Sequence, residues 1–349
     1  MAAPGKVVLV LLTSTEPLAG AYDLAMLDLD GVVYIGQHAV DGAAAHIRRA
    51  REAGMRVAFI TNNASRPAAV VAEHLRELGV AAGTDDVVTS AQAAARLLRD
   101  RFGAGVPVLC LGGPGLSAAL EEAGLLPVGA EADAVAVVSG YGPDLPWRDI
   151  MHAAVRIRDG LPWVASNADH TIPTTYGVAP GHGVLVDMVR RFTGVTPQVA
   201  GKPSRPLLDE TVRRVGGRRP LMVGDRLDTD IEGARNAGVD SLLVLTGVTG
   251  LAELVAARPG ERPGYLSSDL AGLSSAHASP QKADRSWRLG GWTGRADDGR
   301  LVMERTGAGP AVDDWWRVAA VTAWEHRDRT GAVLDVSTAL IPGTGPRAR

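Results

Sequence analysis

Short apolar runs alternate with longer amphipathic segments along residues 22–254. Short apolar runs that end at Gly, Asp or Ser predict buried strands, and apolar positions three or four residues apart predict helices. This alternation is typical of an α/β fold built on a parallel sheet. The predicted strands cover residues 24–28, 56–60, 107–111, 134–139, 162–166, 220–224 and 241–245. The predicted helices cover residues 42–53, 66–78, 90–102, 184–192, 204–215 and 231–237.

The pattern changes after residue 254. Residues 266–280 are rich in Ser, Ala and Gly, which predicts a linker. Five of the seven tryptophans follow residue 280, and we expect Trp315 and Trp316 to form a core there rather than a platform for a ligand. Residues 281–345 therefore predict a small α+β appendix. Its elements would be hairpin strands at 287–292 and 300–304, a helix at 313–327 capped by Asp313 or Asp314, and a final strand at 332–341.

Composition narrows the classes of partner. The 349-residue chain has a formal net charge of −3 and no basic block, which argues against nucleic-acid binding and against a polybasic membrane patch. No apolar run approaches the ~20 residues that span a bilayer. We therefore expect a small-molecule partner, with no nucleic acid and no membrane.

The N-terminus and the single cysteine bear on location. The apolar run at residues 7–12 follows Lys6 but is shorter than the roughly 7–15 residues of a signal peptide core. Residues 1–20 are interpreted as an extension, and whether they belong to the mature protein stays open. Cys110 is the only cysteine, so no internal disulfide or cysteine metal site can form. A cytoplasmic location is expected.

Four polar segments carry the candidate chemistry. They are Asp28-Leu-Asp30-Gly31, Thr61-Asn62-Asn63, Lys202-Pro203, and Gly224-Asp225 with Asp230. Three of them directly follow a predicted strand. Because the carboxyl ends of parallel strands converge on one edge of the sheet, these distant segments are predicted to meet in one crevice.

Carboxylates gathered in one crevice repel each other unless one protonates or a cation lies between them. Asp28, Asp30 and Asp225 offer oxygen ligands with no nearby His or Cys, a set that suits Mg²⁺. A single aspartate after a strand would more often be an ordinary turn residue. The four segments in this order favour function.

Lys202 and Thr61 complete the expected site. Only three of the 36 basic residues are lysines, so a lysine at Lys202 is notable where arginine is the usual choice. A compact ammonium can contact a carboxylate and a phosphoryl oxygen together. The Thr61 hydroxyl and the backbone amides after it could hold an anionic oxygen.

These residues resemble a known family. The order DxDG, TNN, GKP and GDxxxTD is that of the haloacid dehalogenase superfamily, and the fuller wording is similar to its subfamily IIA, which includes nitrophenyl-phosphate and phosphoglycolate phosphatases. The resemblance spans roughly residues 22–269. With the tryptophan-bearing appendix included, the chain is most similar to the glycerol 3-phosphate phosphatases of actinobacteria.

The resemblance implies a Rossmann-like, doubly wound parallel-sheet core with an inserted α/β cap domain. The core would comprise residues 21–82 and 200–265, and the cap residues 83–199. A linker at residues 266–280 would lead to the C-terminal appendix.

The resemblance also implies roles for single residues. Asp28 would be the nucleophile and a Mg²⁺ ligand, and Asp30 the general acid/base, which also binds Mg²⁺ through its carbonyl. Lys202 would share in catalysis and bind the phosphoryl group together with Thr61 and Asn62. Asp225 would complete the metal site, and Asp230 would orient the ion and its waters. The reaction would pass through a covalent aspartyl-phosphate.

Substrate selection is expected from the cap. Its polar turn segment offers Asn167, Asp169 and His182 as substrate contacts, although a plain packing loop is an equal alternative. The leading function is a Mg²⁺-dependent phosphatase for small monoesters, with glycerol 3-phosphate ahead of phosphoglycolate and sugar phosphates. A phosphotransferase or mutase, and a catalytically silent binding protein, are the alternatives. A homodimer is left open.

Overall fold

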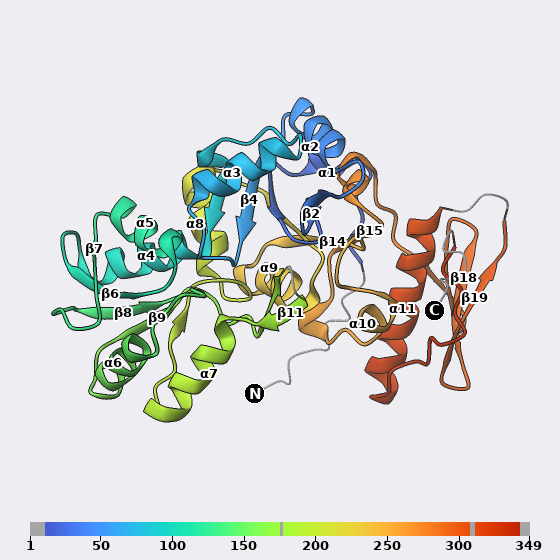
Figure 1. Cartoon of the computed structure of the whole chain (residues 1–349). Coiled ribbons are helices and arrows are strands. Elements are labelled where there is room, and N and C mark those ends of the chain that lie inside the picture. Colours follow the sequence, from blue (N-terminus) through green and yellow to red (C-terminus); the bar gives the residue numbers. More distant parts are fainter. Residues whose placement is uncertain (1–10, 175–176, 308–310, 343–349) are drawn as a thin grey trace, which may run out of the picture.

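The structure is a computed structural model that describes residues 11–174, 177–307 and 311–342 (Figure 1). Its central sheet has six parallel strands in the order β15-β14-β13-β1-β4-β5. The strands are β1 (Leu24–Asp28), β4 (Arg56–Thr61), β5 (Val87–Thr89), β13 (Pro220–Gly224), β14 (Asp240–Val244) and β15 (Tyr265–Ser267).

Helices cover both faces of this sheet because its strands are apolar on both sides. In β1, Ala25 and Leu27 belong to one buried cluster, whereas Leu24 and Met26 belong to another on the opposite face. Around this sheet lie α1 (Leu18–Ala21), α2 (Ala43–Glu52), α3 (Ala68–Glu77), α4 (Ser90–Phe102), α8 (Pro206–Val215), α9 (Glu232–Ala237) and α10 (Leu251–Val255). A small hairpin of β2 (Tyr34–Ile35) and β3 (His38–Ala39) follows β1. The predicted Rossmann-like core is confirmed.

The inserted cap contains a second parallel sheet, in the order β12-β9-β8-β6-β7. Its strands are β6 (Pro107–Leu111), β7 (Leu126–Val128), β8 (Ala136–Ser139), β9 (Trp163–Ala165) and β12 (Gln198–Val199). Its helices are α5 (Pro114–Glu122), α6 (Trp147–Arg158) and α7 (His182–Thr193), with a hairpin of β10 (Thr171–Thr174) and β11 (Gly177–Pro180). The predicted cap boundary at residue 83 is too early, because β5 pairs with β4 of the core.

The predicted linker at residues 266–280 is wrong. Part of this segment completes β15, and a 3₁₀ turn (Leu270–Ser274) follows with Leu270 and Leu273 buried. The predicted extension at residues 1–20 is also wrong for its described part. Leu11 and Leu18 are buried, and the Leu12 amide donates to the carbonyl of Gly264 over 2.8 Å.

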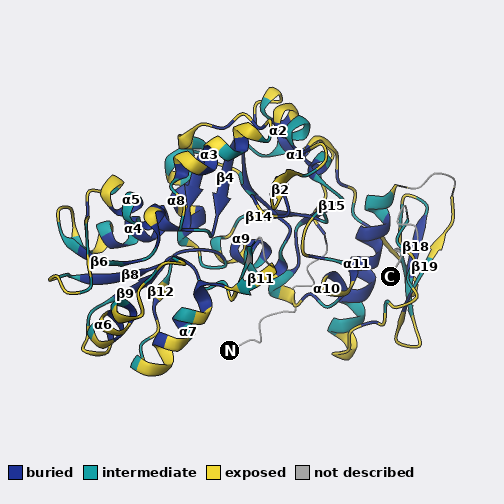
Figure 2. Cartoon of the chain, viewed as in Figure 1, coloured by how far each residue is buried: buried dark blue, intermediate teal, exposed yellow. Residues whose placement is uncertain are grey.

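The C-terminal unit, residues 281–342, pairs a four-stranded antiparallel sheet with one long helix. The strands are β16 (Gln281–Ala283), β17 (Ser286–Leu289), β18 (Trp292–Asp297) and β19 (Arg300–Arg305), and the helix is α11 (Val312–Thr330). Helix α11 lies between this sheet and the core, contacting α10 and β15 on one side and β18 on the other (Figure 1). Its middle is buried all round, as Figure 2 shows.

Several details of the appendix differ from the prediction. Gly290 and Gly291, both with positive φ, form a turn inside the strand predicted at 287–292. The residue before α11 is Ala311, so neither Asp313 nor Asp314 caps the helix. Residues 332–341 form no strand. Trp315 and Trp316 are buried as predicted, in a cluster shared with core residues such as Leu243. No helix in the described part of the chain is long and apolar enough to cross a bilayer.

Candidate active site

The functional side chains lie at one edge of the core sheet. Strands β13, β1 and β4 are neighbours, so their carboxyl ends bring Asp225, Asp28 and Thr61 together. Lys202 reaches the same place from the loop between β12 and α8. The sheet order therefore assembles residues that are far apart in the sequence.

Three carboxylates form a cluster able to hold a cation. Oxygens of Asp28, Asp225 and Asp230 all lie within 4.8 Å of one another. Oδ2 of Asp225 accepts a hydrogen bond from the Val248 amide over 2.7 Å, whereas its Oδ1 is buried with no hydrogen-bond partner in the described structure. A buried carboxylate oxygen without a donor is what a hard metal ion would satisfy. The donor set therefore fits Mg²⁺.

Two glycines make room for Asp225. A Cβ on Gly31 would lie 2.4 Å from Oδ2 of Asp225, and a Cβ on Gly247 would lie 1.9 Å from the same atom. Real side chains do not approach so closely, so the backbone can pass the carboxylate only where glycine stands. Any larger residue at either position would displace Asp225 from the cluster.

Lys202 is the cation of the site. Its Nζ donates to Oδ1 of Asp28 over 2.5 Å and to Oδ1 of Asp230 over 2.7 Å, and its side chain is only 3% exposed. Burial disfavours the charged ammonium, but the attraction of Asp230 and Asp28 outweighs burial and raises the pKa of Lys202. Lys202 is therefore a permanent positive charge.

The carboxylates outnumber this ammonium. Burial, with repulsion from Asp230 and Asp225, raises the pKa of Asp28 well above its ordinary value despite the opposing effect of Lys202. Burial and then Asp230 raise the pKa of Asp225 to about 6, against the Val248 amide and Lys202. A divalent cation beside them would favour the ionised forms of both groups.

Asp230 holds the ammonium group of Lys202 from the core. It comes from a π-helical turn (Leu227–Ile231), and its Oδ2 accepts from the Arg226 amide over 3.1 Å while Oδ1 accepts from Lys202. A Cβ on Gly224 would lie 2.2 Å from the Cβ of Asp230. Oδ1 of this aspartate thus holds the ammonium, while Oδ2 fixes the carboxylate itself to the Arg226 backbone.

Asp30 occupies the outer side of the site. Its side chain reaches solvent at the rim, yet the surrounding protein still desolvates it enough to raise its pKa. Arg66, Lys202 and His74 oppose that rise. A carboxyl that keeps its proton to higher pH suits the donation of a proton to a leaving group.

The Asn62 side chain links the core to the cap. Its Oδ1 accepts from the Lys202 amide over 2.8 Å, and its Nδ2 donates to the Lys202 carbonyl over 2.9 Å and to Oδ1 of Asp169 over 3.1 Å. The side chain therefore holds the lysine segment and a cap residue, and binding of a phosphate by the Asn62 backbone amide stays a prediction. Thr61 is buried beside it, and its Oγ1 accepts from the Asn63 amide over 3.0 Å.

The three predicted substrate contacts divide into two groups. Nδ2 of Asn167 donates to the Asn62 carbonyl over 2.7 Å, and Oδ1 of Asn167 accepts from the Asp169 amide over 3.1 Å. His182 donates through Nδ1 to the Asn167 carbonyl over 2.8 Å, and burial lowers its pKa to about 4. These contacts of Asn167 and His182 brace the cap loop and favour the packing role that the sequence left as an equal alternative. Asp169 remains at the site.

Comparison with known proteins identifies the family to which this chain belongs. The sequence pattern of the haloacid dehalogenase-like hydrolases matches residues 25–126, and a related HAD-hydrolase-like pattern matches residues 199–273. The D-glycerol 3-phosphate phosphatase of Mycobacterium tuberculosis is 46% identical over 259 residues, which are 74% of this chain and 72% of that protein. The chain belongs to the haloacid dehalogenase-like hydrolase family.

Other members of the family extend the likeness. An acid sugar phosphatase of Staphylococcus aureus is 34% identical over 235 residues, which are 67% of this chain and 90% of that protein. The crystal structure of the M. tuberculosis glycerol phosphate phosphatase in complex with magnesium superimposes with a TM-score of 0.80 and 41% identity, over 89% of this chain and 93% of that one. The predicted family resemblance and fold class are confirmed.

Sequence reasoning missed one loop of this haloacid dehalogenase-like site. Residues 246–249 follow β14 and pass over Asp225: the Val248 amide binds its carboxylate, and Oγ1 of Thr249 donates to its carbonyl over 2.5 Å. Oγ1 of Thr246 donates to the Gly31 carbonyl over 2.5 Å. The sequence signal that could have identified this loop was its place directly after the strand predicted at residues 241–245, the same place that three of the four polar segments occupy. Arg66, four residues after Asn62, was also missed.

Proposed function

We propose that this chain releases inorganic phosphate from small phosphate monoesters, with glycerol 3-phosphate as the leading substrate. The observation that carries the proposal is Lys202 held between Asp28 and Asp230, beside an oxygen of Asp225 that has no hydrogen-bond donor. One ammonium and one cation position then face the same nucleophilic carboxylate. This combination suits the binding of a doubly charged phosphoryl group.

Asp28 is the nucleophile of the proposed reaction. One of its carboxylate oxygens attacks the phosphorus while the bond from phosphorus to the ester oxygen breaks, which leaves an aspartyl-phosphate. Asp30 gives its proton to the departing alkoxide and later takes a proton from the water that hydrolyses the intermediate. Lys202 offsets phosphoryl charge throughout.

Asp28 and Asp225 would hold Mg²⁺, with the Asp30 carbonyl as a further ligand and Asp230 behind them. When bound, the ion supplies positive charge that reduces repulsion between the Asp28 carboxylate and the phosphoryl oxygens.

The choice of substrate rests on two supports. The M. tuberculosis relative at 46% identity is a D-glycerol 3-phosphate phosphatase, whereas the S. aureus relative at 34% identity is an acid sugar phosphatase. In addition, Asp169 presents a carboxylate acceptor from the cap loop, held by Asn62, which suits the hydroxyl groups of glycerol. Sugar phosphates and phosphoglycolate rank behind glycerol 3-phosphate.

The test is a panel of phosphate monoesters assayed with Mg²⁺ and with a chelator. We expect Mg²⁺-dependent phosphate release with the highest kcat/KM for glycerol 3-phosphate, and loss of Mg²⁺-induced thermal stabilisation in Asp225→Asn. An acceptor alcohol added to the assay separates hydrolysis from phosphoryl transfer. A rate of phosphate release that is unchanged by the chelator, or no release from any monoester, would refute the proposal.

We also infer that two copies of the chain associate through one face of the cap. Helices α6 and α7 contact each other, and each presents apolar residues four positions apart to solvent, with between 36% and 61% of each residue exposed. They are Trp147, Met151 and Val155 on α6, and Val184, Met188 and Phe192 on α7. Single exposed apolar residues are ordinary, but a contiguous patch marks an interaction surface.

A second copy suits this face because the face is self-complementary. The two stripes have equal length, and charges of both signs border them, such as Arg158 with Asp159 and Arg190 with Asp187. Two such faces would bury on the order of 1,000 Å², near the lower limit for a specific interface.

We expect a dimer in sedimentation velocity and a monomer for the double variant Met151→Glu with Met188→Glu, whereas Val333→Glu, at an exposed site in the C-terminal unit, stays dimeric. A monomeric wild-type protein at micromolar concentration would refute the inference.

A further inference from the structure

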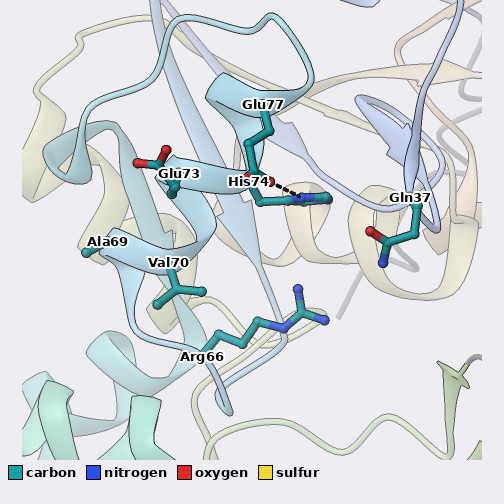
Figure 3. A pocket seen from close by; sticks show the side chains of 7 residues that line it. All are labelled: Gln37, Arg66, Ala69, Val70, Glu73, His74 and Glu77. Carbon is teal, nitrogen blue, oxygen red and sulfur yellow. Dashed lines mark ion pairs between the residues drawn. The ribbon is translucent and has the colours of Figure 1, made fainter.

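A hollow of about 440 Å³ lies between the β2–β3 hairpin and α3, outside the carboxylate cluster (Figure 3). Gln37 lines it from the turn of the hairpin, Arg66 from the segment before α3, and the remaining residues from α3 itself. These are Ala69, Val70, Glu73, His74 and Glu77. The floor therefore combines two small apolar side chains with planar polar groups.

A short series of contacts links the hollow to Asp30. The ring of His74 packs edge-on against the ring of Tyr34, with 5.1 Å between ring centres. Tyr34 in turn forms a backbone bridge with Asp30, and its carbonyl accepts from the Gly31 amide over 2.8 Å. Contacts through His74 and Tyr34 thus connect the hollow with the backbone of Asp30. A leaving-group oxygen that receives a proton from Asp30 would have the hollow next to it.

Among the charged side chains that line the hollow, Arg66 is the one that forms no ion pair within the described residues. Glu73 forms an ion pair with Arg76, and Nδ1 of His74 lies 3.5 Å from a carboxylate oxygen of Glu77, a contact that is ionic only when the imidazole is protonated. Arg66 is exposed, and within the described ranges it makes no hydrogen bond and no ion pair. Figure 3 shows its guanidinium group extended into the space near His74 and Gln37. A free guanidinium offers paired donors that match a carboxylate or a phosphate.

We propose that this hollow binds the alcohol portion of substrates in which that portion carries an oxyanion, either a carboxylate or a second phosphate, and that Arg66 is the group that binds it. Ala69 and Val70 contact the carbon chain, and the Gln37 amide donates a further hydrogen bond. Arg66 is thereby a specificity residue for a set of esters beyond glycerol 3-phosphate. The inference rests on the proposed phosphatase activity.

A matched pair of esters tests the carboxylate. Glycerol 3-phosphate and 3-phosphoglycerate have the same carbon chain, but only the second carries a carboxylate on the alcohol side. In Arg66→Met we expect the ratio of kcat/KM for 3-phosphoglycerate to that for glycerol 3-phosphate to fall roughly tenfold or more, mainly through KM, because a charge-assisted bidentate contact is lost. Arg66→Lys should restore part of the ratio.

A second comparison, of fructose 1,6-bisphosphate with fructose 6-phosphate, tests the binding of a second phosphate. Where a charged ester is not turned over, its inhibition constant against glycerol 3-phosphate hydrolysis replaces kcat/KM. Arg48→Met, on the exposed face of α2, serves as the control and should leave every ratio unchanged.

The outcomes separate this inference from the proposed function. Equal losses for charged and uncharged esters in Arg66→Met, or no change in any ratio or inhibition constant, overturn the hollow as an oxyanion site while phosphatase activity stands. Absence of phosphate release from every ester in the wild-type protein overturns the proposed function first, and the hollow with it.

Discussion

The active-site edge of the core and the junction of the core with the C-terminal unit both bury charged side chains, but they balance those charges differently. At the active-site edge Lys202 faces two carboxylates directly, with a third beside them that keeps one oxygen unpaired. At the junction the guanidinium group of the buried Arg317 donates hydrogen bonds to three acceptors. Its donors reach the Leu266 carbonyl over 3.1 Å, Asp314 over 3.1 Å and Nδ1 of His277 over 3.0 Å.

Asp313 completes the junction. Its carboxylate accepts from Oγ of Ser267 over 2.7 Å and from the Ser268 amide over 2.8 Å, so that α11 is bound to the end of β15. At the junction every buried charged group has a partner, and these contacts attach one element to another. At the active site the buried carboxylates exceed the positive charge and one oxygen has no donor, which leaves room for a ligand. The comparison separates residues needed for turnover from residues needed for attachment.

The largest effect is expected at the nucleophile. Asp28→Asn removes the attacking carboxylate and should lower kcat by a factor on the order of 10⁴ or more. The melting temperature should not fall, because one of three mutually repelling carboxylates is gone. Phosphate release and thermal unfolding measure the two effects, with the exposed Asp209→Asn as control. A comparable rate of release in Asp28→Asn would mean that no aspartyl-phosphate forms.

An intermediate effect is expected at the junction. Arg317→Met leaves Asp314 and His277 without their buried partner, so the free energy of unfolding should fall by about 3 kcal/mol. In urea titrations, Arg295→Met, which removes surface ion pairs with Asp297 and Glu304, should lower the free energy of unfolding far less than Arg317→Met. Where Arg317→Met is still folded, kcat should match the wild-type value. A large loss of kcat in the folded variant would contradict the division between turnover and attachment, because the junction would then contribute to turnover.

The smallest effect concerns pH. Burial, with the charge of Arg317, lowers the pKa of His277 below its ordinary value. The unfolded chain therefore binds this proton more readily than the folded protein, so stability is complete above pH ~6.5 and declines as the pH falls below it. Urea titrations at pH 7.5 and 5.5 should show a smaller decline for His277→Gln than for wild type. An equal decline in both proteins would remove His277 from the junction's charge balance.

The sequence predicted the active site better than it predicted the cap contacts. Asp28 and Asp225 could be identified because Asp28 ends an apolar strand and Asp225 directly follows one, and parallel strands bring such ends together. The roles of Asn62 and Asn167 could not be identified in this way. Their amide groups bind backbone atoms more than 100 positions away, and no local pattern specifies those partners.

The errors in the fold have a similar cause. Strand β15 has three residues in a segment rich in Ser and Gly, too short to show a periodicity, and only its place at the edge of the core sheet makes it a strand. The C-terminal tryptophans predicted a separate small core. Instead they pack with Leu243 and Leu254 of the catalytic core, because α11 has apolar residues on both sides and needs a partner on each.

One carboxamide, that of Asn62, joins three parts of the chain: the end of β4, the backbone of Lys202 where the chain returns from the cap, and Asp169 at the tip of the cap loop. Loss of this carboxamide would therefore loosen the lysine segment and the cap loop together, although the carboxamide contacts neither the ammonium nor the three clustered carboxylates.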